Sequence, residues 1–138
     1  MILNVLAVGD VVGESGVEYL NRHLRSLKKL HEVHFTVVNG ENASGVGILP
    51  RQARDIFDAG ADVITLGNHT WNRIQIADFL EDDRYTLRPA NYTNRVPGRG
   101  WGAPGCCGRA AMWSAPPPAR KNAEFRSARL GESHRSTG

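Results

Sequence analysis

Short apolar, β-branched runs alternate along this chain with stripes of apolar residues at helical spacing. The runs predict buried strands, at residues 2–8, 33–38, 62–66 and 86–87. Between them, apolar residues recur every three or four positions, which predicts helices, at residues 14–31, 50–60 and 74–80. This order predicts an α/β fold in which parallel strands alternate with helices, right-handed crossovers join the strands, and both faces of the sheet are covered.

Glycine-containing polar motifs follow three of the four predicted strands. They read Gly-Asp-Val-Val-Gly at 9–13, Asn-Gly-Glu-Asn at 39–42 and Gly-Asn-His-Thr-Trp at 67–71. The intervals between them are about one strand-helix repeat each. The carboxyl ends of parallel strands share one edge of the sheet, and ligands bind outside that edge. The sequence therefore predicts a single site there, with the candidate residues Asp10, Glu41, Asn42, Asn68 and His69.

The candidate side chains supply carboxylate and amide oxygens and one imidazole. Hydrolysis of a phosphate ester needs charge neutralisation on the phosphoryl oxygens and an activated water, and a two-metal site supplies both. Glu41 is the candidate for a bridging carboxylate, with Asp10 on one metal ion and Asn68 on the other. His69 is the candidate that gives a proton or hydrogen bond to the leaving oxygen.

Several of these residues also have a purely structural interpretation. Asp10 and Asn68 could each cap the helix that follows, since Asp and Asn are favoured N-caps. Turn geometry explains Asn42 nearly as well as a site does. Trp71 is expected to be a packing residue rather than a platform for substrate stacking. Arg88 is left open between a phosphate contact and a surface salt bridge.

The three motifs, in this order and spacing, resemble the calcineurin-like metallophosphoesterase superfamily. More narrowly, they resemble its bacterial branch of 2′,3′-cyclic-nucleotide 2′-phosphodiesterases, as do Arg-Pro-Ala-Asn-Tyr at 88–92 and Val-Pro-Gly-Arg-Gly at 96–100. The resemblance covers about residues 2–102. It implies the N-terminal part of a four-layer α/β/β/α sandwich with two divalent metal ions, iron or manganese, with magnesium or zinc as alternatives. It also implies site roles for five residues: metal ligands at Asp10, Glu41 and Asn68, a catalytic acid at His69 and a further site residue at Asn42.

The resemblance stops where the composition changes. The family needs later histidine ligands, in His-Ala-Glu-like and Thr-His-Thr-His-like runs, but the only histidine after His69 is His134. Residues 97–138 contain no Val or Ile and hold 7 Lys or Arg against 2 Asp or Glu, whereas residues 1–96 hold 10 against 12. We therefore expect residues 1–102 to be an N-terminal portion of a metallophosphoesterase domain. Residues 103–138 are expected to be a disordered tail, as after a frameshift or truncation.

The leading hypothesis is a metal-dependent phosphoesterase that hydrolyses small phosphodiesters such as 2′,3′-cyclic nucleotides and is inactive or impaired in this chain. The alternatives are a non-catalytic fragment, or a nucleotide-binding α/β module whose basic tail contacts nucleic acid. That tail lacks interleaved aromatic residues, so nucleic acid is not the expected partner. No apolar run approaches the ~20 residues that cross a bilayer, and the start has no basic region typical of a signal peptide. A cytoplasmic location without a membrane partner is expected, and the oligomeric state is left open.

Overall fold

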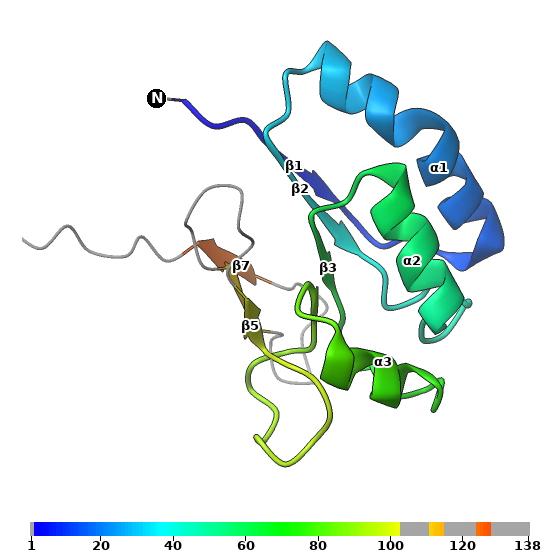
Figure 1. Cartoon of the computed structure of the whole chain (residues 1–138), viewed down its shortest axis with the longest axis vertical. Coiled ribbons are helices and arrows are strands. Elements are labelled where there is room, and N and C mark those ends of the chain that lie inside the picture. The colour runs from blue at the N-terminus through cyan, green and yellow to red at the C-terminus, as the bar shows by residue number, and fades with distance from the viewer. Residues whose placement is uncertain (1, 103–110, 115–123, 128–138) are drawn as a thin grey trace, which may run out of the picture.

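A computed structural model describes residues 2–102, 111–114 and 124–127 of the 138-residue chain (Figure 1). Its first sheet has four parallel strands in the order β1-β2-β3-β4, namely β1 (Val5–Val8), β2 (Phe35–Asn39), β3 (Val63–Thr65) and β4 (Thr86–Leu87). Three helices connect them, namely α1 (Gly13–Leu30), α2 (Pro50–Ala59) and α3 (Ile76–Asp82). The α/β fold class predicted from the sequence is confirmed.

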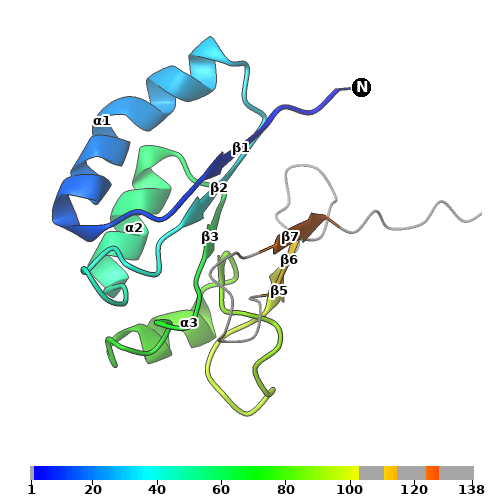
Figure 2. The same ribbon diagram turned by 180° about the vertical axis from the view of Figure 1, so that it is seen from behind.

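All three helices lie on the same face of the four-stranded sheet, as Figures 1 and 2 show from opposite sides. The sequence predicted that both faces of the sheet are covered, and the helices supply the cover on this face. The strands are added in sequential order, so every crossover moves along the sheet in the same direction. Crossovers between parallel strands are right-handed, and right-handed crossovers that all move one way place every helix on one face.

The helix-covered face contains the main apolar core. Leu24 of α1, Ile56 of α2 and Ile64 of β3 meet there and are fully buried or nearly so. The predicted apolar stripe on α1 is buried only in its first part, because Leu27 and Leu30 are 40% and 73% exposed. The last turns of this helix therefore extend beyond the sheet that the helix covers.

The opposite face of the sheet is also apolar. Val37, Val63 and Leu87 form a second buried cluster there, against which Phe35 packs. A three-stranded antiparallel sheet lies on this side, namely β5 (Trp101–Gly102), β6 (Ala111–Ser114) and β7 (Glu124–Ser127), in the order β5-β6-β7 (Figure 2). The described layers are thus helices, a parallel sheet and an antiparallel sheet.

Strands β6 and β7 lie within the segment 103–138 that the sequence predicted to be disordered. Antiparallel pairing joins these two strands to each other and β6 to β5. The rest of segment 103–138 falls outside the described residues, and its expected disorder stays a prediction. In the part of the chain that the structure describes, no helix is long and apolar enough to cross a membrane.

Gln52, which is 2% exposed, holds the loop after β2 against the start of α2. Its side-chain oxygen accepts hydrogen bonds from the Ser44 hydroxyl (2.6 Å) and the Leu49 backbone N–H (3.0 Å). Its side-chain nitrogen donates to the Ala43 carbonyl (2.8 Å) and to the Glu14 carboxylate (3.1 Å). Because a buried amide left without partners is costly, this network fixes the loop that carries the second strand-end motif.

The Glu14 carboxylate connects α1 to α2 and makes a small contribution to stability that depends on pH. Hydrogen bonds from Arg51, and then from Gln52, lower the pKa of Glu14 below its ordinary value of 4.5. A carboxyl whose pKa is lower in the folded state stabilises the fold above its unfolded-state pKa and loses this effect as pH falls through the folded-state value. The effect is small because the pair is exposed to solvent and to salt.

We therefore expect Glu14→Gln to lower the unfolding midpoint at about pH 7 and to lower it less at about pH 3. Glu18→Gln is the matched control, since Glu18 lies on the same helix and, among the described residues, pairs only with the exposed Arg22 (3.5 Å). Thermal unfolding of the wild type and both variants across this pH range measures the difference. A Glu14→Gln effect that is the same at both pH values would show that the ion pair contributes nothing.

Candidate active site

Backbone hydrogen bonds join the segments that follow β1 and β2 to each other, and the segment after β2 to the end of β3. The Val11 N–H donates to the Asn39 carbonyl (3.0 Å), and the Gly13 N–H donates to the Asn42 carbonyl (2.9 Å). The Gly40 N–H donates to the Thr65 carbonyl (3.0 Å). The first two strand-end motifs are therefore fixed to each other, and the second is fixed to the end of the strand that leads into the third.

Neither Asp10 nor Asn68 caps a helix, so the alternative interpretation of these two residues is wrong. The N-cap of α1 is Val12 and that of α3 is Gln75, and neither makes a side-chain capping bond. Asp10 instead accepts hydrogen bonds from a residue of the next motif. The Asn68 side chain is exposed and forms no hydrogen bond with the described residues.

Asn42 bridges Asp10 and His69. Its side-chain nitrogen lies 3.0 Å from each carboxylate oxygen of Asp10, and its side-chain oxygen lies 2.9 Å from Nδ1 of His69. An ionised carboxylate only accepts hydrogen bonds, so the NH₂ group of Asn42 faces Asp10 and the amide oxygen faces the imidazole. An amide oxygen also only accepts, so Nδ1 of His69 carries a proton. Turn geometry alone does not account for Asn42, because both of its contacts reach other motifs.

Glu41 also lies close to His69. Its Oε2 atom is 3.4 Å from the backbone N–H of His69 and 4.0 Å from Nδ1 of the ring, and its side chain is 19% exposed. The carboxylate occupies the space above Gly67, where a Cβ atom would lie 2.6 Å from both Cδ and Oε1 of Glu41. Glycine at this position is therefore what allows Glu41 to reach the third motif.

The third motif forms a tight turn that presents Asn68 and His69. The Thr70 hydroxyl donates to the Gly67 carbonyl (2.6 Å), and the Asn72 N–H donates to the His69 carbonyl (3.1 Å). The structure thus joins four of the five candidates in a chain of polar contacts, Asp10, Asn42, His69 and Glu41. The fifth, Asn68, is adjacent in sequence but contributes no polar side-chain contact among the described residues.

The donor set suits a hard divalent cation only in part. Asp10 and Glu41 offer carboxylate oxygens, and Asn68 offers an exposed amide oxygen, which are ligand types that magnesium and manganese accept. The cradle over Gly67 keeps the Glu41 carboxylate at this edge of the sheet. Within the described ranges, however, no three His, Cys, Asp or Glu side chains form a group that could hold a metal ion.

Residues outside the third motif, and others within it, also hold this motif in place through contacts that were not predicted from the sequence. The Arg73 side chain donates to the carbonyls of Val46 and Ser44 (both 3.1 Å) and so connects the loop after β2 to the turn after β3. Trp71 forms an edge-to-face pair with Tyr92, with 4.9 Å between ring centroids. The expectation that Trp71 packs agrees with this contact. Its partner Tyr92 lies in the Arg-Pro-Ala-Asn-Tyr pattern of the family resemblance, which is the feature of the sequence that singled out this segment.

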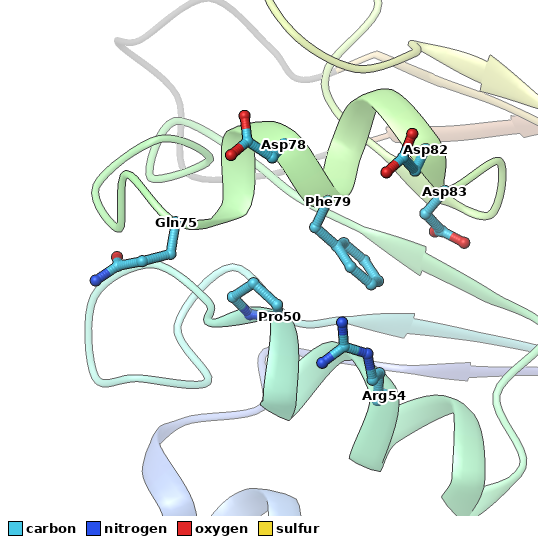
Figure 3. A pocket seen from close by; sticks show the side chains of 7 residues that line it. All are labelled: Pro50, Arg54, Gln75, Asp78, Phe79, Asp82 and Asp83. Carbon is cyan, nitrogen blue, oxygen red and sulfur yellow. The ribbon is translucent and has the colours of Figure 1, made fainter.

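A pocket of about 470 Å³ lies between α2 and α3, away from the strand ends (Figure 3). Phe79 and three aspartates line it, with Arg54 of α2 placed 5.6 Å from the centre of the Phe79 ring. None of the five candidate residues lines this pocket. The pocket is therefore separate from the polar cluster at the sheet edge.

Two solved structures share this fold. A crystal structure of a hypothetical protein from Thermus thermophilus matches with a TM-score of 0.68 and 31% identity, over 77% of this chain and 41% of that one. A novel phosphatase from Mycoplasma pneumoniae matches with a TM-score of 0.66 and 26% identity, over 72% of this chain and 37% of that one. The fold and the strand-end cluster therefore define a phosphatase-like α/β class.

Sequence comparison narrows this class to one family. The family described as YmdB-like protein matches residues 6–110, and the chain belongs to it. A 2′,3′-cyclic-nucleotide 2′-phosphodiesterase of Bacillus subtilis (strain 168) is 40% identical over 99 residues, which is 71% of this chain and 38% of that protein. The resemblance inferred from the motifs is thereby confirmed. The chain spans about two fifths of the length of these relatives.

Proposed function

We propose that this chain carries the strand-end half of a metal-dependent phosphodiesterase site that acts on small phosphodiesters such as 2′,3′-cyclic nucleotides. The observation that carries the proposal is the contact chain from Asp10 through Asn42 to His69 and Glu41. The 40%-identical Bacillus subtilis relative supplies the substrate class.

In this proposal, the metal ligands are Asp10, Glu41 and Asn68. Glu41 would be the carboxylate shared by two metal ions, one held by Asp10 and the other by Asn68. Bound metal ions would neutralise phosphoryl charge and lower the pKa of a water that attacks phosphorus. Manganese or magnesium fits the oxygen ligands of the described residues better than zinc, which prefers nitrogen and sulfur.

His69 is proposed to protonate the leaving oxygen. When water attacks phosphorus, the P–O bond to a ribose oxygen breaks and that oxygen takes a proton. Because Nδ1–H of His69 is held by the Asn42 amide oxygen, the available proton is on Nε2 of the imidazolium form. Asn42 thus orients the ring. Because Asn42 also donates to Asp10, the orientation of the ring depends on the position of a proposed metal ligand.

The test is hydrolysis of 2′,3′-cyclic AMP and of a chromogenic bis-aryl phosphate by the purified full chain, with manganese or with a chelator. Metal-dependent release of a single phosphomonoester is expected. Metal or nucleotide binding without any turnover would contradict the proposed activity and would instead support a non-catalytic binding module. Hydrolysis that is unchanged by the chelator would contradict the metal dependence.

We expect His69→Ala to lower the hydrolysis rate by about 10²–10⁴-fold, the usual contribution of a general acid, while leaving metal affinity unchanged. His34→Ala is the matched control, because His34 is exposed and lies outside the polar contact chain. Steady-state rates and calorimetric titration with manganese measure the two effects separately. Loss of metal binding in His69→Ala would reassign His69 as a metal ligand.

A further inference from the structure

Arg88 is a buried cation without a carboxylate partner in the described part of the chain. It follows β4 directly and is 4% exposed. Within residues 2–102, 111–114 and 124–127, its guanidinium donates only to backbone carbonyls, those of Pro89 (3.0 Å), Gly98 (3.1 Å) and Thr93 (3.4 Å). The surface salt bridge that the sequence left open for Arg88 is therefore wrong, whereas the phosphate contact stays a prediction. A buried charge needs hydrogen bonds to offset its lost hydration, and here one segment supplies all of them.

These bonds close residues 88–99 into a compact loop. The Arg88 backbone N–H donates to the Arg99 carbonyl (2.9 Å), which joins the two ends of the loop. A Cβ atom at Gly100 would overlap the Cα and Cβ of Ala90, so the returning chain packs tightly on the start of the loop. The Gly98 N–H also donates to the Glu81 carboxylate (3.2 Å), which attaches the loop to α3. Arg88 is thus the internal connector of a loop that is fixed at its base.

The loop contacts the turn that carries the proposed acid. Tyr92, which lies within the loop, meets Trp71 edge to face, with an interplanar angle of 86°. Trp71 is two residues after His69 and packs on the main core. Aromatic pairs of this geometry contribute beyond their buried area, and both rings have few rotamers, so the contact restricts the turn.

We propose that Arg88 and Tyr92 are positioning residues for His69: Arg88 closes the loop, the loop holds Tyr92 against Trp71, and Trp71 fixes the turn that presents the imidazole. The inference rests on the proposed function of His69. His69 has two supports in this arrangement. Asn42 holds its ring, and the Trp71–Tyr92 pair holds its backbone turn.

The experiment reads the His69 ring directly, in the metal-free full chain at a single alkaline pH. Long-range ¹H–¹⁵N spectra distinguish a ring protonated at Nδ1 from one protonated at Nε2. The wild type is expected to show His69 in the Nδ1–H form. Tyr92→Leu removes the ring contact and is expected to add a second set of His69 ring signals. Tyr92→Phe restores the contact and is expected to match the wild type, because the Tyr92 hydroxyl makes no hydrogen bond with the described residues.

Arg88→Lys is the second variant, because a single ammonium cannot match the spread of the three carbonyls that the planar guanidinium reaches. It is expected to change the His69 signals in the same way as Tyr92→Leu. Tyr85→Leu and Arg84→Lys are the matched controls, since both residues are exposed and precede the loop. Where metal-dependent turnover is measurable, Tyr92→Leu should lower kcat by about 10- to 100-fold with little change in KM, as expected for a misplaced acid.

His69 signals that stay unchanged in folded Tyr92→Leu and Arg88→Lys would overturn the inference, and so would equal changes in the two controls. If one of the two test variants does not fold, the other decides. The tautomer measurement needs neither metal nor substrate. A wild type that shows no turnover would therefore contradict the proposed function and leave this result readable.

Discussion

Replacing Gly67 with Ala is expected to lower metal-dependent hydrolysis on the order of 100-fold or more and to leave the fold intact. The new Cβ would lie 2.6 Å from Cδ and Oε1 of Glu41, so the carboxylate has to move away from the third motif. The atoms that move are the end of a flexible side chain, and the backbone at Gly67 needs no left-handed conformation. The substitution should therefore lower activity rather than stability. A displaced Glu41 carboxylate would weaken the proposed metal site and with it the charge stabilisation of the transition state.

Gly9→Ala is the matched control, because a Cβ at Gly9 would have no atom within 4 Å and the position lies beside Asp10 in the first motif. Manganese affinity, hydrolysis rate and unfolding midpoint should be measured for both variants. Gly9→Ala should match the wild type in all three. A Gly67→Ala variant with wild-type manganese affinity would show that the position of Glu41 does not matter for metal binding. A large fall in its unfolding midpoint would instead show that Gly67 is a structural requirement of the turn.

Ile64→Ala is expected to lower the free energy of unfolding by about 2–5 kcal/mol. Ile64 lies in β3 with no exposed area, at the centre of the core between the sheet and the helices. Truncation there loses apolar burial and leaves a cavity that the surrounding strands and helices cannot fill. Since domains of this size have only about 5–15 kcal/mol of stability, this single change removes much of it.

Ile74→Ala makes the same chemical change at a residue that is 75% exposed, and it should alter stability by no more than about 0.5 kcal/mol. Urea unfolding followed by far-ultraviolet circular dichroism measures both variants. Equal losses in the two variants would contradict the placement of the core on the helix-covered face.

The sequence was a good guide to the elements because their signals are local. Pro50 begins α2 and Gly60 ends it with a left-handed φ of 117°, as the residue types predict. The four predicted strand segments form β1 to β4 and pair in parallel. Each observed strand is no longer than the apolar run that predicted it. Nothing in these segments opposed the local preference, so tertiary packing did not have to override it.

The site followed from the sequence only as a set of positions. Parallel strands with right-handed crossovers bring their carboxyl ends to one edge whatever the side chains are, which is why Asp10, Asn42 and His69 could be grouped from the sequence alone. Which of them touch was not predictable. Asn42 contacts His69, which is 27 positions away in the sequence, and Asp10, which is 32 positions away. The backbone hydrogen bonds between the loops determine which way the Asn42 side chain points.

By itself, then, the sequence determined the alternation of strands and helices and the edge at which the polar motifs gather, because both follow from short-range periodicity and chain chirality. The tertiary structure decided the rest. It placed all helices on one face, removed the capping roles of Asp10 and Asn68, and buried Arg88 inside its own loop. Each of these outcomes depends on which distant backbone groups are within hydrogen-bonding reach, and that is a property of the assembled fold rather than of any local segment.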